Sequence, residues 1–209
     1  MNKVFVDVGI SLDGFLGGPN RGPHNPIGDG GLEIHKWMFA QKAFLQHLHL
    51  DASHGESNNK DNDIIEEIFQ RIGANIMGRR MFDEGEANWP EEAPFGTPVF
   101  VLTHHLREPW ERKGGTTFYF VNEDIHGVLE KAKQAAGNKD VRISGGASTI
   151  QQYVNAGLVD ELQIHFAPIL LGNGIRLFDN FEKGRFYIEP ERVINSSRVT
   201  HIQYRVVKP

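Results

Sequence analysis

The chain has 209 residues, a formal net charge of −5 and no cysteine. Without cysteine it can form no disulfide, thiolate zinc site, iron–sulfur cluster or cysteine nucleophile. Its hydrophobic fraction of 39% and charged fraction of 23% are typical of a soluble globular protein, and the negative charge argues against broad nucleic-acid binding.

The first predicted element is a buried strand from Lys3 to Ile10, where hydrophobic residues alternate with other types. The segment Ser11–Phe15 then turns the chain. Residues 17–31 are rich in glycine and proline, which predicts a long loop of the kind that is usually functional or disordered. Helical spacing follows from Leu32 to Leu50, and the polar segment 51–63 is expected to be a mobile connection.

The rest of the chain alternates between strands and helices. Asp63 is expected to cap a helix that continues to Ile72 and stops at Gly73. We then expect strands over 74–77, 98–103, 118–121, 141–144 and 162–169, helices over 124–136 and 147–156, and an antiparallel pair over 185–195 and 199–207. This order predicts one α/β domain over residues 1–209, with a mostly parallel central sheet, helices on both faces and a C-terminal antiparallel hairpin.

Three predicted strands end in residues suited to binding phosphate. The strand 141–144 enters Gly145-Gly146 before a helix, so the backbone can approach a ligand closely and the first N–H groups of the helix favour phosphate. The strand 74–77 ends at Gly78-Arg79-Arg80, and arginine is the usual partner of a phosphate. The strand 98–103 ends in small and polar groups. Each motif alone could be a turn or a solvated surface, but together they predict a nucleotide with several phosphates.

Five ordered motifs resemble those of the dihydrofolate reductase-like superfamily, and within it stand-alone proteins similar to the RibD C-terminal domain, the reductase domain of bacterial riboflavin biosynthesis. The motifs occupy residues 11–15, 77–80, 102–104, 144–148 and 160–178. The resemblance spans nearly the whole chain and is weakest from about residue 40 to 62. It implies a three-layer dihydrofolate reductase-like fold, a homodimer, and hydride transfer from NADPH to a small pterin-like or ribosylaminopyrimidine-like substrate.

The resemblance assigns each part of NADPH to a group of residues. They are Gly9, Leu16 and Gly17 for the nicotinamide, Gly78, Arg79 and Arg80 for the 2′-phosphate side, Leu102, Thr103 and His104 for the adenosine, and Gly145, Gly146, Ala147, Ser148 and Thr149 for the pyrophosphate. The glycines could equally serve only turns and packing, and Ser148 or Thr149 could cap the helix that follows.

The proton donor or substrate anchor is expected among acidic residues near the nicotinamide. Dihydrofolate reductases carry an acid on the first helix, and Glu33 is its nearest match. Asp13 is the second candidate, although it could instead cap its own turn. Trp37, Phe39 and Trp89 could form an aromatic wall for a flat ring or belong to the core.

Several classes of function remain as alternatives or are set aside. Dihydrofolate reductase activity itself, or a non-catalytic NADPH-binding sensor or interaction protein, would share the same motifs. The zinc deaminase that is often fused to the riboflavin reductase needs cysteines that this chain lacks. No metal is expected from His47, His49 and His54, because positions two apart do not share a helix face. With no signal peptide and no run of about 20 apolar residues, we expect a cytoplasmic protein without a membrane partner.

Overall fold

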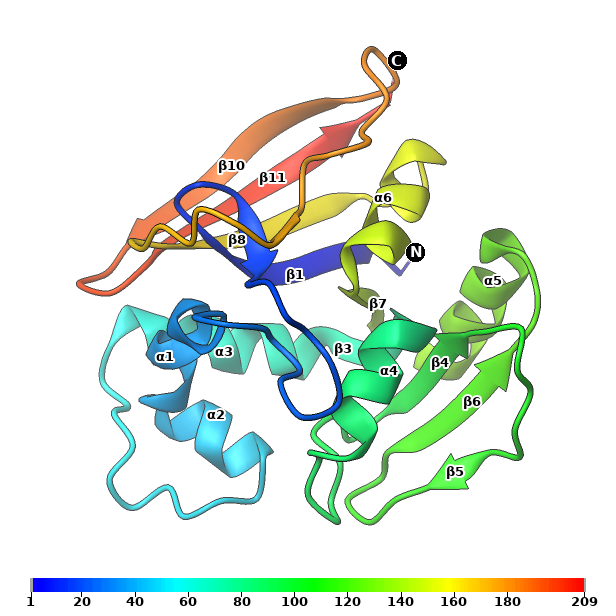
Figure 1. Cartoon of the computed structure of the whole chain (residues 1–209), viewed down its shortest axis with the longest axis horizontal. Helices are drawn as coiled ribbons and strands as arrows, with labels where there is room; N and C mark the ends of the chain where they lie inside the picture. Colours follow the sequence, from blue (N-terminus) through cyan, green and yellow to red (C-terminus); the bar gives the residue numbers. More distant parts are fainter. Residues whose placement is uncertain (1, 209) are drawn as a thin grey trace.

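The computed structural model describes residues 2–208 and is organised around one large sheet with helices on both faces (Figure 1). The strands of this sheet are β1 (Val4–Ser11), β3 (Ile72–Gly78), β4 (Pro98–Leu102), β5 (Trp110–Glu111), β6 (Thr117–Val121), β7 (Asp140–Gly145), β8 (Glu161–Ala167), β10 (Tyr187–Asn195) and β11 (Thr200–Val207). Their order is β10-β11-β8-β1-β7-β3-β4-β6-β5. The six strands from β8 to β6 are parallel, and both edges are antiparallel.

Alternation along the strands gives the sheet two different faces. On one face Val4, Val6 and Ile10 pack in the main core beneath α5 (Ile125–Ala136) and α6 (Ala147–Asn155). The other face carries two separate groups of helices. The helices α1 (Leu32–Phe39), α2 (Lys42–His47) and α3 (Lys60–Arg71) form one group, and α4 (Arg79–Glu86) packs through Phe82 over β3, β4 and β6.

The expected fold class is confirmed, since the central sheet is mostly parallel, lies between helical layers and carries β10 and β11 as a C-terminal antiparallel hairpin. Figure 1 shows this hairpin at one edge of the sheet and β5 at the other. The short strands β2 (Phe15–Gly17) and β9 (Ile175–Arg176) form a small second sheet that the sequence pattern does not predict. Within residues 2–208 no helix combines the length and apolar character that a bilayer crossing requires.

The prediction of one helix from Leu32 to Leu50 is wrong. The helix breaks at Gln41, whose backbone is extended with φ −93° and ψ 136°. There the chain forms a short bridge with Glu56, because Lys42 N donates to Glu56 O (2.8 Å) and Glu56 N donates to Ala40 O (2.9 Å). This pairing with a distant segment replaces the hydrogen bonds that a continuous helix would make.

The predicted start and end of the next helix are also wrong. Helix α3 begins at Lys60, and its cap is Asn59, whose side chain accepts a hydrogen bond from Asn62 N (2.9 Å). Gly73 does not stop this helix, because it lies inside β3, which follows α3 directly. A Cβ atom at Gly73 would lie 2.5 Å from Ala136 O, so glycine is needed here for close packing against the end of α5. Helix α4 (Arg79–Glu86) is not among the predicted helices.

Candidate functional site

A cavity of about 520 Å³ lies between the two groups of helices on one face of the sheet. Helices α1, α2 and α3 line one side, and α4 with residues 88–95 lines the other. The loop that carries Arg21, Pro26 and Ile27 crosses between them, and Figure 1 shows this blue loop in front of the sheet. The carboxyl ends of β1, β7 and β8 form the floor, which is where ligands bind in open α/β sheets.

The glycine turn between β7 and α6 forms one end of the cavity. Gly145, Gly146 and Ala147 line it, and Gly145 has a φ of +134°, which favours glycine. Gly146 is the N-cap of α6, and no side chain satisfies the first N–H groups of that helix. A Cβ atom at Gly146 would have no atom within 4 Å. This helix start therefore faces open space, as an anion-binding site requires.

Only part of the residues predicted for the cofactor line this cavity. Gly9 and Leu16 do. Gly17 does not, and its glycine serves packing, because a Cβ atom there would lie 2.7 Å from Ile27 O. Ser148 and Thr149 also lie outside the lining residues and do not cap α6.

The other predicted residues lie along the neighbouring strand ends, outside the cavity wall. They are Gly78, Arg79 and Arg80 after β3, and Leu102, Thr103 and His104 at the end of β4. Arg79 pairs with Asp83 (2.6 Å) and Arg80 with Glu84 (3.0 Å), each across one turn of α4. A Cβ atom at Gly78 would lie 2.4 Å from Thr149 Oγ1, so the starts of α4 and α6 are adjacent.

Neither acidic candidate for the proton donor lines the cavity. Glu33 is exposed and pairs with Lys36 (2.6 Å). Asp13 holds a turn, as the alternative for this residue proposed: its carboxylate accepts hydrogen bonds from Ser11 Oγ (2.5 Å), Leu171 N (3.1 Å) and Gly172 N (2.7 Å). The hydrogen bond from Ser11, together with those from the two backbone groups, lowers the pKa of Asp13 to about 2.

This pKa predicts how the Asp13 turn contributes to stability. Because the folded-state pKa is lower than the value of about 3.9 expected in the unfolded chain, the carboxylate stabilises the fold above about pH 4. This contribution is lost as the pH falls through about 2. We expect Asp13→Asn to lower the urea midpoint at neutral pH and the gap to wild type to close between about pH 4 and 2. Asp63→Asn, an exposed acid on α3, controls for the removal of charge, and a gap that is constant with pH would contradict the prediction.

A row of buried and partly buried polar side chains crosses the floor of the cavity. Five adjacent strands contribute one residue each, and all five side chains lie on the face covered by α1, α3 and α4. In sheet order they are His201 (β11), His165 (β8), Asp7 (β1), Arg142 (β7) and Asn75 (β3). We call this set the polar row. Asp7, Arg142 and His165 line the cavity directly.

Hydrogen bonds connect the polar row from end to end. The distances are 2.6 Å for His201 Nδ1 to His165 Nδ1, 2.8 Å for His165 Nε2 to Asp7 Oδ1, 3.4 Å for Arg142 Nη1 to Asp7 Oδ2, and 2.8 Å for Arg142 Nε to Asn75 Oδ1. At the β11 end, His201 Nε2 lies 3.0 Å from Asp61 Oδ1 of α3. The row is therefore one connected network rather than a set of separate contacts.

Side chains of α1 cover this network. The Trp37 ring lies 4.9 Å from both the His165 and His201 rings, between centroids, and is itself buried. His35 also lines the cavity, and burial lowers its pKa to about 4, so it is neutral at physiological pH. Across residues 2–208 no group of three or more histidine and acidic side chains is placed to hold a metal ion.

Comparison with known proteins identifies the family of the chain. The model of the RibD C-terminal domain matches residues 2–184. The chain belongs to the RibD C-terminal domain family. It is 42% identical to the uncharacterized protein YyaP of Bacillus subtilis over 182 residues, which cover 84% of this chain and 80% of that protein.

Solved structures agree with this membership at the level of the fold. A Shewanella sp. PV-4 protein named for riboflavin biosynthesis superposes over 100% of both chains with a TM-score of 0.66 and 21% identity. The dihydrofolate reductase of Enterococcus faecalis superposes over 98% of this chain and 96% of its own, with a TM-score of 0.51 and 12% identity. The expected dihydrofolate reductase-like fold is thus confirmed for this RibD C-terminal domain.

Sequence reasoning missed the polar row in this RibD-family chain. Neither His165 nor Asp7 is among the site residues that the sequence predicts. A usable signal was present in β1, which is apolar or small up to its last residue, Ser11, except for the charged side chain of Asp7. What the pattern could not supply is that these strands are neighbours in the sheet.

Proposed function

We propose that this protein is a reductase that binds NADPH and passes a hydride to a small, flat heterocyclic substrate. One observation carries the proposal. A single cavity joins the uncapped start of α6 at Gly146, which suits a phosphate, to a buried cluster of titratable and aromatic side chains, which suits a polar ring. Membership of the RibD C-terminal domain family supports the same reaction class.

The residues at the strand ends fit the cofactor. The N–H groups at the start of α6 would hold the pyrophosphate, and the nicotinamide would lie against Gly9 and Leu16.

Arg79 has a buried Nη1 atom without a hydrogen-bond partner in residues 2–208, and it stands at the N-terminus of α4, where the helix dipole also favours an anion. Arg79 and Arg80 would therefore hold the 2′-phosphate, with the adenosine near Leu102, Thr103 and His104. The structure of the E. faecalis dihydrofolate reductase is itself a complex with NADP(H). Bound NADPH supplies the hydride.

The opposite end of the cavity would hold the substrate. The aromatic side chains Trp37, Phe44 and Phe69 line it, and Trp37 Nε1 is a buried donor without a partner in the described chain. Arg142 has a third guanidinium nitrogen, Nη2, that makes no hydrogen bond within residues 2–208. Together these donors and rings suit a pterin-like or ribosylaminopyrimidine-like ring that carries carbonyl oxygens.

Dihydrofolate reductase activity proper is the weaker candidate, because Glu33, the match to the acid of the first helix, is exposed and outside the cavity. A non-catalytic NADPH-binding sensor would have the same cofactor site as the reductase and would differ only in that it does not oxidise NADPH. A homodimer stays a prediction that follows from the family resemblance, and a cytoplasmic location stays an expectation from the sequence.

Cofactor binding is the first test. We expect NADPH fluorescence to titrate with a Kd of about 10 µM or less and NADH to bind more weakly. A Kd above about 1 mM for both dinucleotides would contradict the proposal. Oxidation of NADPH is then followed by absorbance with 7,8-dihydrofolate and with the ribosylaminopyrimidine phosphate as probes. Tight binding without oxidation by either probe would favour the sensor.

A further inference from the structure

The proton count of the polar row is fixed by its hydrogen bonds. Three of these bonds join Asp7, His165, His201 and Asp61 into a chain of alternating groups: carboxylate, imidazole, imidazole, carboxylate. Every hydrogen bond needs one proton, and an ionised carboxylate supplies none. Two neutral imidazoles supply two. The chain from Asp7 to Asp61 is therefore complete only when it holds a third proton.

The charges of the cluster lead to the same number. Arg142 contributes one positive charge beside Asp7, and the carboxylates of Asp7 and Asp61 contribute two negative charges. With the third proton the cluster is electrically neutral, and without it a net negative charge is buried. The Asp61 and His201 side chains are only 5% and 1% exposed, so an uncompensated charge here would be costly.

The third proton belongs to the Asp7–His165 pair. Burial, reinforced by the nearby His165, lowers the pKa of His201 to about 4, so His201 is neutral and donates through Nε2 to Asp61. Its Nδ1 must then accept from His165 Nδ1. His165 Nε2 faces Asp7 Oδ1, and the remaining proton lies between these two atoms. Burial raises the pKa of Asp7, but the hydrogen bond and charge of His165 and the charge of Arg142 lower it overall, so Asp7 is the carboxylate of the pair.

We propose that the Asp7–His165 pair stores a proton at the cavity wall and donates it to the substrate during reduction. The inference rests on the proposed function. The hydride brings an electron pair to the carbon of a C=N bond of the substrate, and the π bond breaks. The electrons of the π bond move to the nitrogen, which takes the proton from the Asp7–His165 pair. NADPH is oxidised to NADP⁺. The pair is then one proton short.

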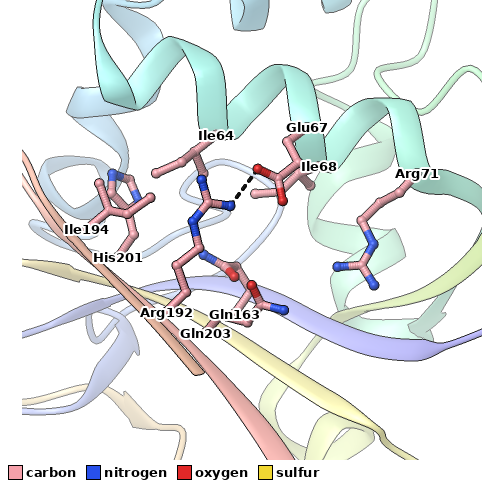
Figure 2. A pocket seen from close by; sticks show the side chains of 9 residues that line it. All are labelled: Ile64, Glu67, Ile68, Arg71, Gln163, Arg192, Ile194, His201 and Gln203. Carbon is pink, nitrogen blue, oxygen red and sulfur yellow. Dashed lines mark hydrogen bonds and ion pairs between the residues drawn. The ribbon is translucent and has the colours of Figure 1, made fainter. Parts of the chain in front are cut away.

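The far end of the chain provides a route for reloading. His201 also lines a shallow groove between α3 and the strands β8, β10 and β11, beside Ile64 and Ile194 (Figure 2). Its volume of about 10 Å³ is close to what one water molecule needs. A proton from solvent can therefore enter at the His201–Asp61 end while the substrate fills the cavity at the Asp7 end. The groups that face the pair are Arg142 on β7, His35 on α1, His201 on β11 and Asp61 on α3.

The stored proton can be observed without cofactor or substrate. We expect the ¹⁵N–¹H spectrum of histidine-labelled protein at about pH 7.5 to show both ring nitrogens of His165 protonated, although a histidine is ordinarily neutral there. Asp7→Asn should remove this proton, because an amide can donate to Nε2 itself. Asp61→Asn should remove it from the far end, since the cluster would otherwise become positive. Asp63→Asn, two residues away and exposed, should leave the spectrum unchanged, and His165→Gln assigns the signal.

Donation is tested by the rate of NADPH oxidation with whichever probe is reduced. We expect Asp7→Asn to slow the hydride step by about 100-fold or more, with the NADPH Kd changed by less than about threefold.

Each outcome has a distinct meaning. A neutral His165 in the wild type at about pH 7.5 overturns the stored proton, whatever the turnover measurements show. A charged His165 with an Asp7→Asn rate equal to wild type overturns donation. If the wild type neither binds nor oxidises NADPH, the proposed function and the donation step fail together. The NMR experiment needs no cofactor, so it still decides whether the pair stores the proton.

Discussion

Replacing Gly146 with valine is expected to weaken NADPH binding by about 100-fold or more while the protein remains folded. The residue has a φ of −72°, which any L-amino acid adopts, and a Cβ atom there would meet nothing within 4 Å. The added side chain therefore costs the fold little. It would occupy the space above the first N–H groups of α6, where the pyrophosphate must approach the backbone closely.

The neighbouring glycine would not give a clean result. Gly145 has a φ of +134°, and a Cβ atom there would lie 3.0 Å from Met81 Sδ, so a substitution would strain the backbone as well as the site. Gln152→Val is the matched control, because it places the same side chain on the exposed surface of the same helix. Binding is measured by fluorescence titration and folding by thermal unfolding. A folded Gly146→Val protein that binds NADPH like wild type would show that the pyrophosphate lies elsewhere.

The parts of the fold that depend on local pattern could be predicted from the sequence. Val4, Val6 and Ile10 alternate along β1, and Asp124 caps α5 at the residue where the predicted helix begins. The turn at Gly145-Gly146 is equally local, since it needs only a strand, two glycines and a helix in succession. These features are fixed by neighbours in the sequence, so a single sequence contains them.

The parts that depend on distant pairing could not be predicted. Gln41 ends α1 because the chain there pairs with Glu56, and helical spacing alone continues through it. The polar row is the extreme case. His165 and His201 are register partners on adjacent strands, yet 36 residues separate them, and Asp7 lies 158 residues from His165. A buried charge can be recognised from the sequence, but its partner is known only once the strand order is known.

The double variant Arg79→Ala, Arg80→Ala is expected to weaken NADPH by about 50-fold or more and NADH by less than about threefold. The two dinucleotides differ only in the 2′-phosphate, so the ratio of their Kd values isolates the group that these arginines would hold. A phosphate pairs with guanidinium through charge-assisted hydrogen bonds, and Arg79 Nη1 is buried without a partner in residues 2–208.

The loss should arise at the binding site, because the variant leaves no buried carboxylate without a partner. Glu84 is buried and would lose Arg80, but Arg21 still pairs with it. Asp83, the partner of Arg79, is 43% exposed and can be hydrated. Arg192→Ala is the matched control, since Arg192 forms a comparable exposed pair with Glu67 (2.7 Å). This pair lies in the shallow groove that His201 also lines (Figure 2). Both Kd values are measured by fluorescence at one ionic strength, because screening weakens phosphate contacts. Equal weakening of NADPH and NADH would place the 2′-phosphate away from α4 and leave these arginines as partners of Asp83 and Glu84 alone.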